Sequence, residues 1–190
     1  MKYHNITHDD MLNGQGLRVV LWVSGCNHRC DECQNPITWD VNNGVEFDED
    51  AEKELLDDLK KNYVEGVTFS GGDPLHTQNR DEITRLAKKI KDEFPSKDIW
   101  LYTGYLWEEI KDLEIVKYID VLVDGPFKKE VKDVKLHWKG SANQRVIDVK
   151  KTIYDPCPYG YHMPAQDAWT NFTTGTTNYN MGNIAEYNVV

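Results

Sequence analysis

The sequence predicts an α/β fold built on a mainly parallel sheet of about five strands with crossover helices. Short runs of β-branched and apolar residues alternate along the chain with longer segments of helical periodicity. The first four of these runs end in glycine or polar residues, and parallel α/β folds bind their ligands at the carboxyl ends of the strands. A length of 190 residues is sufficient for one domain with a substantial core.

The predicted strands are short and mostly apolar. Turn residues bound them, and the first ends at Gly25, directly before a group of cysteines. A strand–helix–strand order requires crossover connections, which are typical of parallel sheets. The strands are expected at residues 17–24, 67–72, 99–104, 119–125 and 143–149.

Three helices are expected between these strands. Residues 47–62 have apolar side chains on one face, with acids at the start and lysines at the end, as the helix dipole favours. Apolar residues recur at helical spacing in residues 79–94, and Pro95 then stops the helix. A short third helix is expected at residues 106–113.

Composition restricts the class of partner. The formal net charge is −10, and the chain has no cluster of Lys and Arg. This charge disfavours nucleic acid or a membrane surface as the main partner. The apolar run near Val19 to Val23 is too short to span a bilayer, and the first residues lack the apolar core of a signal peptide. We therefore expect a cytoplasmic protein.

Three of the four cysteines are close together. Cys26, Cys30 and Cys33 form a C-x3-C-x2-C pattern, whereas Cys157 is remote. Disulfide-stapled domains spread their cysteines, so the trio indicates metal binding or redox chemistry. A tetrahedral zinc site would need a fourth ligand, from Cys157 or His28, and a ferredoxin-type cluster would need a fourth cysteine. Three thiolates on a cubane iron–sulfur cluster would instead leave one iron open for a further ligand.

The cysteine spacing resembles the signature of the radical S-adenosylmethionine (SAM) superfamily. Ser70-Gly71-Gly72-Asp73-Pro74 resembles the G-G-E-P motif of that superfamily, with Asp in place of Glu, although a Gly-Gly pair is also a common turn. Glu32 departs from the pattern, because many members have an aromatic residue there. The resemblance implies a partial, open β/α barrel, a [4Fe-4S] cluster held by three cysteines, and SAM bound at the open iron.

A closer resemblance, over about residues 1–153, is to the activating proteins of anaerobic (class III) ribonucleoside-triphosphate reductases. It is carried, in this order, by M-K-Y-H-N-I, N-G-Q-G-L-R, V-S-G-C-N-H-R-C-D-E-C-Q-N, S-G-G-D-P-L-H, D-I-W-L-Y-T-G-Y, V-L-V-D-G-P-F and W-K-G-S-A-N-Q-R-V-I-D. It implies an enzyme that cleaves SAM reductively to methionine and a 5′-deoxyadenosyl radical. This radical would generate a glycyl radical on the reductase large subunit, which is the protein substrate. The usual electron donor of the family is a reduced flavodoxin.

The resemblance also implies a role for particular residues. Cys26, Cys30 and Cys33 would ligate the cluster. The residues expected to contact SAM are Glu32, Cys33 and Gln34 beside the last thiolate, Gly71, Gly72 and Asp73 at its methionine ammonium, Thr103 with Gly104, and Asp124 at its methionyl or ribose part. No catalytic residue beyond the cluster and SAM is implied, because hydrogen abstraction by a carbon radical depends above all on proximity.

Some of these residues have structural alternatives. Asp124-Gly125-Pro126 also fits a tight turn. The run Asn143-Gln144-Arg145 fits either a polar strand cap or a clamp for a carboxylate. Tyr102, Tyr105 and Trp107 are more typical of a core than of cofactor contacts.

Two other functions are compatible with the cysteines. One is an activating protein for a different glycyl-radical enzyme, although D-G-P-F and G-S-A-N-Q-R match the reductase family better. The other is a metal-stabilised or electron-transfer protein without SAM chemistry, which leaves the Gly71-Gly72 pair without a role.

The composition changes near residues 153/154. Residues 154–190 contain no Lys or Arg and are rich in Tyr, Thr, Asn and Gly. We therefore expect an activase domain at 1–153 and a C-terminal extension at 154–190. The run Y-D-P-C-P-Y-G-Y-H-M-P weakly resembles the opening of lectin-like domains in bacterial surface proteins, but the segment is too short to bury its own core. A fused fragment, a cloning artefact and a partner-docking tail are the alternatives, and we expect the extension to be poorly ordered and non-catalytic, with Cys157 a free thiol.

Overall fold

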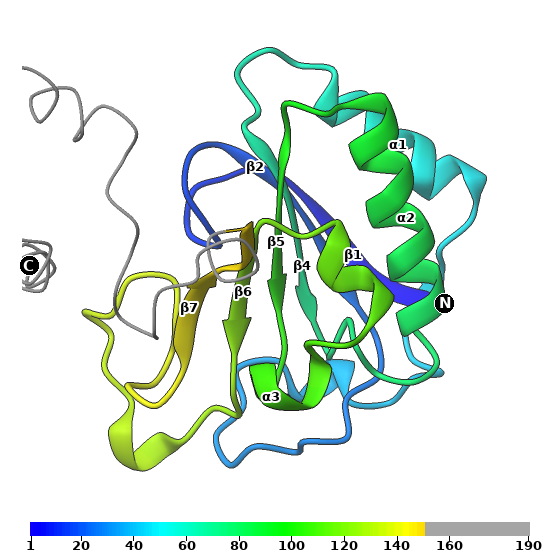
Figure 1. Ribbon diagram of the computed structural model, residues 1–190. Helices are drawn as coiled ribbons and strands as arrows, with labels where there is room; N and C mark the ends of the chain where they lie inside the picture. The colour runs from blue at the N-terminus through cyan, green and yellow to red at the C-terminus, as the bar shows by residue number, and fades with distance from the viewer. Residues whose placement is uncertain (151–190) are drawn as a thin grey trace, which may run out of the picture. The chain divides into compact units, whose positions relative to one another are not determined.

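The structure, a computed structural model, describes residues 1–150, of which residues 1–149 form one compact unit. Its centre is a seven-stranded sheet in the order β3-β1-β2-β4-β5-β6-β7 (Figure 1). Strands β2, β4, β5 and β6 run parallel, whereas β1, β3 and β7 are antiparallel to their neighbours. The strands are β1 (Lys2–Asp10), β2 (Arg18–Val23), β3 (Val45–Glu46), β4 (Gly66–Gly71), β5 (Asp98–Tyr102), β6 (Val121–Asp124) and β7 (Arg145–Asp148).

Helices connect the parallel strands. Helix α1 (Glu49–Leu59) precedes β4, α2 (Arg80–Glu93) precedes β5, and α3 (Trp107–Ile110) with the 3-10 helix η2 (Glu114–Lys117) precedes β6. Two further 3-10 helices, η1 (Pro36–Thr38) and η3 (Lys129–Val131), lie in loops. The side chain of Asp48 caps α1 by accepting a hydrogen bond of 3.0 Å from the backbone N–H of Ala51.

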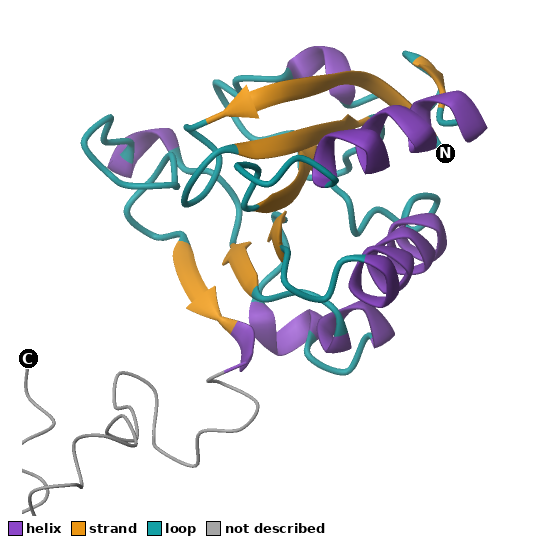
Figure 2. Cartoon of the chain, turned by 90° about the horizontal axis from the view of Figure 1, so that it is seen from above, coloured by secondary structure: helices purple, strands orange, loops and turns teal. Residues whose placement is uncertain are grey.

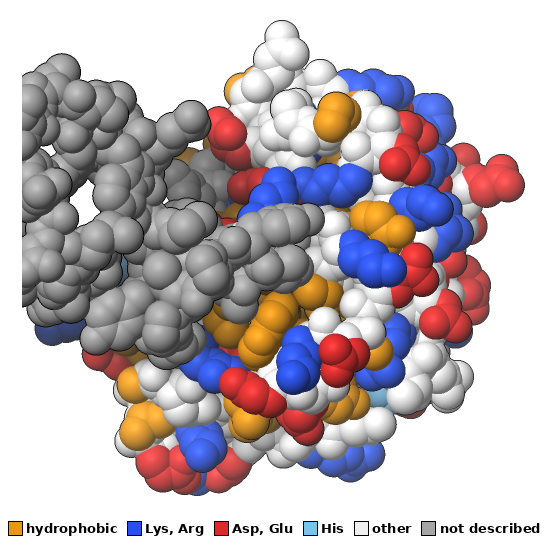
Figure 3. Space-filling model, viewed as in Figure 1, with side chains coloured by type: hydrophobic (Ala, Val, Ile, Leu, Met, Phe, Trp, Pro, Cys, Tyr) orange, Lys and Arg blue, Asp and Glu red, His pale blue; other side chains and the backbone are white. Residues whose placement is uncertain are grey.

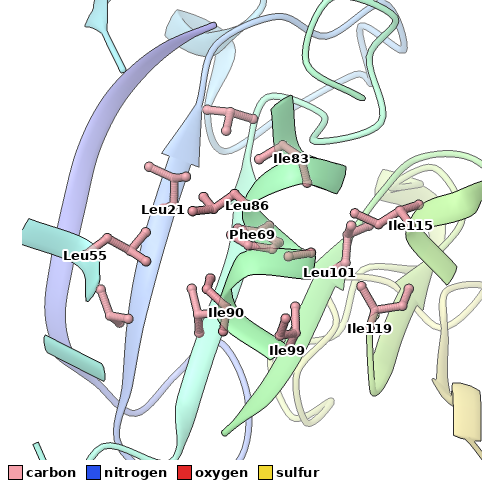
Figure 4. Packing of buried hydrophobic residues seen from close by; sticks show 14 of the residues in the cluster. Leu21, Leu55, Phe69, Ile83, Leu86, Ile90, Ile99, Leu101, Ile115 and Ile119 are labelled. Carbon is pink, nitrogen blue, oxygen red and sulfur yellow. The ribbon is translucent and has the colours of Figure 1, made fainter. Parts of the chain in front are cut away.

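The main hydrophobic core lies between one face of the sheet and the helices. The strand register places Leu21, Phe69, Leu101 and Leu122 side by side, and all four are fully buried. Figure 4 shows Leu21, Phe69 and Leu101 packed against side chains of α1, α2 and the segment around η2, including Leu55, Ile83, Leu86, Ile90, Ile115 and Ile119. The parallel strands follow one another in chain order, so right-handed crossovers bring their helices to the same face. Figure 2 shows α1 and α2 on the same side of the strands.

The opposite face of the sheet carries polar and aromatic side chains. Arg18 is fully buried there, donates from Nε to Thr68 Oγ1 at 2.9 Å, and forms an ion pair with Asp98. Its guanidinium carbon lies 5.3 Å from the centre of the Trp100 ring. A buried cation is stable only when its donors are paired, so this network allows Arg18 to be buried where the parallel strands begin.

The prediction of a mainly parallel α/β sheet is confirmed in part. Four of the expected strands form the parallel centre, but the strand expected at 143–149 is antiparallel, and β1 and β3 were not predicted. Strand β1 has a single buried residue, Ile6, so it shows no apolar pattern and forms through backbone pairing with β2, the outermost of the four parallel strands on that side. The third helix is also shorter than expected, because it ends at Ile110 and continues after a turn as η2.

The surface of residues 1–150 mixes both signs of charge. Figure 3 shows basic and acidic side chains interspersed over the side on which α1 and α2 lie. Glu52 of α1, for example, pairs with Arg85 and Lys89 of α2. Within the described part of the chain, no helix combines the length and apolarity needed to span a bilayer. The boundary expected near 153/154 and the extension 154–190 lie outside the described residues.

Candidate functional site

A cleft of about 710 Å³ lies where the parallel strands end and extends over the face opposite α1 and α2. In Figure 1 these strands point to the lower edge, where the loop after β2 also runs. The volume is in the range of small-molecule sites. Of the residues predicted to bind the cluster or SAM, those that line the cleft are Cys26, Cys30, Cys33, Gln34, Gly71, Gly72, Asp73, Thr103 and Gly104. Glu32 and Asp124 are not among its lining residues.

The three cysteines lie in a tightly curled segment, residues 26–33, which we call the cysteine loop. Arg29 and Glu32 adopt positive φ angles of 47° and 55°, a left-handed conformation in which the backbone reverses direction. The backbone N–H of Cys33 donates to the carbonyl of Cys30 at 3.2 Å. The three thiols are free, partly buried and open to the same cleft.

Backbone N–H groups surround the cysteine sulfurs. Burial raises the pKa of the Cys26 thiol to about 11, although N–H groups of His28 and Arg29 donate to it and act in the opposite direction. Burial also raises the pKa of Cys30, which accepts from the N–H of Phe127. The N–H of Asn35 donates to Cys33 Sγ at 3.4 Å. Such N–H···S contacts are typical around iron–sulfur clusters, where iron displaces the thiol protons.

The side chains fit a cluster better than a single ion. Among residues 1–150, no three His, Cys, Asp or Glu side chains are arranged to hold one metal ion. A zinc site would need its thiolates about 2.3 Å from one point. The Nε2 atom of His28 is not free to bind a metal ion, because it contacts Asp73. Three thiols that open onto one cleft without converging on one point suit a group with several irons.

Asp73 joins the cysteine loop to the ends of two strands. Its carboxylate is buried and accepts hydrogen bonds from Thr103 Oγ1 at 2.9 Å, Gly104 N at 3.1 Å and Leu75 N at 2.8 Å. His28 Nε2 lies 2.7 Å from the same carboxylate, and this hydrogen bond raises the pKa of His28. From the sequence alone, His28 was interpreted as a loop residue, with zinc ligation as the alternative, and its contact with Asp73 was not predicted. Its position between two cysteines was a sequence signal for a role at the site, but its partner, Asp73, lies 45 residues away and no local pattern connects the two.

The glycine pair has a packing reason as well as a place in the cleft. Gly71 has φ +103°, and a Cβ there would lie 2.6 Å from the backbone nitrogen of Val23. A Cβ on Gly72 would lie 2.6 Å from the carbonyl oxygen of Gly25. The end of β4 therefore needs two glycines to pass the end of β2. Their contact with SAM stays a prediction.

Asp124 has partners within the chain. It is fully buried and accepts hydrogen bonds from the N–H of Trp107 at 2.7 Å and from Arg145 Nε at 3.0 Å. Arg145 also donates to Glu108 at 2.9 Å, and this contact lowers the pKa of Glu108 to about 2. Asp124 thus links β6, β7 and the start of α3, and its contact with SAM remains a prediction. Tyr102 lines the cleft, whereas Tyr105 packs against the His28 ring.

The fold and the cleft define a class, an α/β protein whose three thiols fit an iron–sulfur cluster at the carboxyl ends of parallel strands. The 4Fe-4S single cluster domain family matches residues 12–147, a range that includes all three cysteines. The chain is similar to proteins named anaerobic ribonucleoside-triphosphate reductase-activating protein. It is 50% identical to the one from Enterobacteria phage T4 over 146 residues, which are 77% of this chain and 93% of that one. It is 44% identical to the one from Escherichia coli (strain K12) over 150 residues, which are 77% of this chain and 97% of that one. The chain therefore belongs to the family of anaerobic ribonucleoside-triphosphate reductase-activating proteins and contains a 4Fe-4S single cluster domain, as the sequence resemblance predicted.

Proposed function

We propose that this protein is a radical SAM enzyme that generates a glycyl radical on the large subunit of an anaerobic ribonucleotide reductase. The observation that carries the proposal is the cleft, in which the three cysteines of a 4Fe-4S domain and the Gly71-Gly72 turn line the same space. The names of the relatives supply the protein substrate. When bound, a reduced [4Fe-4S] cluster and SAM would supply the radical chemistry, in which SAM would be cleaved to methionine and 5′-deoxyadenosine and a glycine of the partner would lose a hydrogen atom.

The chain itself would bind and orient these groups. Cys26, Cys30 and Cys33 would hold the cluster, and a cluster of four irons with these three protein ligands would keep one iron free for SAM. The backbone N–H groups around the sulfurs would stabilise their negative charge. Trp22 and Tyr102 form part of the cleft wall, which would keep water from a reactive radical.

We assign SAM to the part of the cleft bounded by Gln34, Gly71, Gly72 and Thr103, beside Cys33. The carboxylate of Asp73 already accepts several hydrogen bonds from the protein. Backbone carbonyls of the glycine turn are therefore the better acceptors for the SAM ammonium. Glu32 is exposed and would have to turn toward the cleft, and Asp124 would have to leave its ion pair with Arg145 to touch SAM.

The protein substrate must reach the cleft from outside. We interpret the sheet as a partial, open β/α barrel, with the helices outside and the cleft inside. A closed eight-stranded barrel fills its interior with side chains, whereas an open one leaves a side through which a glycine loop can enter. We further propose a reduced flavodoxin as electron donor, an activase domain at 1–153 followed by a non-catalytic C-terminal extension at 154–190, and a cytoplasmic location, where reductants keep thiols free.

The test is an anaerobic assay of SAM cleavage. The full chain is reconstituted with iron and sulfide, reduced with dithionite and mixed with SAM, and 5′-deoxyadenosine and methionine are measured by chromatography. We expect both products from the wild type and from Cys157→Ser, and neither from Cys30→Ala. Addition of the reductase large subunit should then give a glycyl-radical signal in electron paramagnetic resonance. Zinc retained after chelation, with no product, would overturn the proposal, as would a cluster that reduces a dye but never cleaves SAM.

A further inference from the structure

We propose that His28 is a positioning residue that pins the cysteine loop, through Asp73, to the carboxyl ends of β4 and β5. Pinning would hold the three thiols at a constant place relative to the glycine turn across the cleft. The consequence for SAM rests on the proposed function, whereas the effect on the loop does not. His28 lies between Cys26 and Cys30, but its partner belongs to a different part of the sheet.

Three separate features determine where the His28 ring lies. Nε2 is 2.7 Å from Asp73 Oδ2, and the two side chains are only 19% and 2% exposed. The ring packs edge-on against Tyr105, with centroids 4.7 Å apart and planes at 76°. A Cβ on Gly104 would lie 2.4 Å from His28 Cδ2, so only glycine leaves room for the imidazole. The polar partner, the aromatic partner and the available space therefore select the same position.

Asp73 is an anchor that does not depend on His28. Thr103 Oγ1 lies 2.9 Å from Oδ1 and 3.0 Å from Oδ2. Leu75 N donates to Oδ1 at 2.8 Å, and Gly104 N donates to Oδ2 at 3.1 Å. These donors lie in the turn that follows β4 and just after the end of β5. Removal of His28 should therefore release the cysteine loop while the carboxylate stays where it is.

The other attachments of the cysteine loop lie at its ends or on the surface, apart from the hydrogen bond that Cys30 Sγ accepts from the backbone N–H of Phe127. Near its start, Gly25 N donates to Thr38 O at 2.7 Å and Cys26 N to Trp39 O at 3.0 Å. Asp31 forms an ion pair with Lys129, but their side chains are 70% and 41% exposed. Exposed ion pairs contribute little, whereas a hydrogen bond to a buried carboxylate is strong. The His28–Asp73 contact is thus the principal buried side-chain attachment in the middle of the loop.

The geometry explains why such an attachment would matter for the reaction. The cluster would be carried by the cysteine loop, and SAM would contact both that loop and the turn after β4. A displacement of about 1 Å between two such halves of a site can reduce a rate about a hundredfold. A loop held only at its ends would allow displacements of this kind.

The first experiment measures amide hydrogen exchange by mass spectrometry on the full chain without iron. We expect His28→Ala to speed exchange in residues 26–34 by about tenfold or more, with β2, β4 and β5 unchanged. His28→Gln keeps an N–H donor at a similar reach and should restore slow exchange. Gly104→Ala, which crowds the ring, should resemble His28→Ala. Asp31→Asn is the matched control in the same loop and should leave exchange as in the wild type.

Two outcomes would overturn the pinning role. One is unchanged exchange of the cysteine loop in both His28→Ala and Gly104→Ala. The other is an equal rise of exchange throughout the sheet, which would make His28 a residue of general stability. If His28→Ala does not fold, His28→Gln and Gly104→Ala decide between these outcomes.

The second experiment uses reconstituted protein with iron content matched between variants. We expect His28→Ala to lose iron to a chelator about tenfold faster than the wild type and to show a higher KM for SAM, and His28→Gln to recover both. Unchanged iron release and KM would overturn the functional part of the proposal. If the wild type itself forms no 5′-deoxyadenosine, the proposed function fails, while hydrogen exchange and iron release still decide the role of His28.

Discussion

Replacement of Asp124 by alanine tests whether this carboxylate serves the fold or the ligand. The side chain is fully buried and accepts hydrogen bonds from Trp107 N at 2.7 Å and Arg145 Nε at 3.0 Å. Asp124→Ala would leave the Arg145 guanidinium without its buried partner and the first N–H of α3 without an acceptor. Removal of one partner of a buried ion pair costs about 3–5 kcal/mol.

The structure places the expected value at the lower end of this range. The Arg145 side chain is 28% exposed and keeps its contact with Glu108, so water and a second carboxylate retain part of its stabilisation. We therefore expect a loss of about 3 kcal/mol in the free energy of unfolding for Asp124→Ala. Asp124→Asn keeps one acceptor oxygen but loses the charge, and about 1–2 kcal/mol is expected.

The assay is anaerobic urea unfolding at neutral pH, followed by circular dichroism. Arg145→Ala and the double variant complete a mutant cycle, which isolates the coupling between the two side chains. Asp112→Ala, an exposed acid in the turn after α3, is the control and should stay within about 0.5 kcal/mol of the wild type. The reasoning is refuted if Asp124→Ala unfolds like the wild type but no longer binds SAM, since Asp124 would then be a ligand residue.

Three further predictions concern other parts of the chain. The hydrogen bond to Asp58 raises the pKa of His8, so the stabilisation is complete below the unfolded pKa of about 6.5 and is lost as pH rises through the folded pKa. The wild type should therefore lose stability relative to His8→Gln as the pH rises above about 6.5 in urea titrations, and parallel pH profiles would contradict this. Gly71→Ala should lower the free energy of unfolding by about 1–3 kcal/mol, because the new Cβ would meet the backbone of Val23 and φ is positive. An unchanged urea midpoint would contradict this and would mean that the ends of β2 and β4 move apart to accommodate the methyl group. Cys157→Ser should bind as much iron per chain as the wild type, and a measured loss of iron would make Cys157 a fourth ligand.

The parallel centre of the fold was predictable because its strands are buried and short. Strand β2 has five buried residues of six, and such a continuous apolar run is a strong local signal for a buried strand. Strand β1 was missed because its stabilisation comes from backbone pairing, which leaves no pattern in the side chains. The antiparallel direction of β7 was missed for a related reason. A strand's own residues do not record whether its connection crosses over or returns beside its neighbour.

The sequence by itself determined the thiol chemistry of the site, because three cysteines in one loop keep their mutual spacing whatever surrounds them. It also determined that the glycine turn would lie near them, since parallel strands end at the same edge of a sheet. Only the tertiary structure decided the roles of the buried acids. Asp73 meets His28 and Thr103, and Asp124 meets Arg145, across separations of at least 21 residues. Crossover connections create such pairs, and no local sequence pattern distinguishes a carboxylate that stabilises the fold from one that binds a ligand.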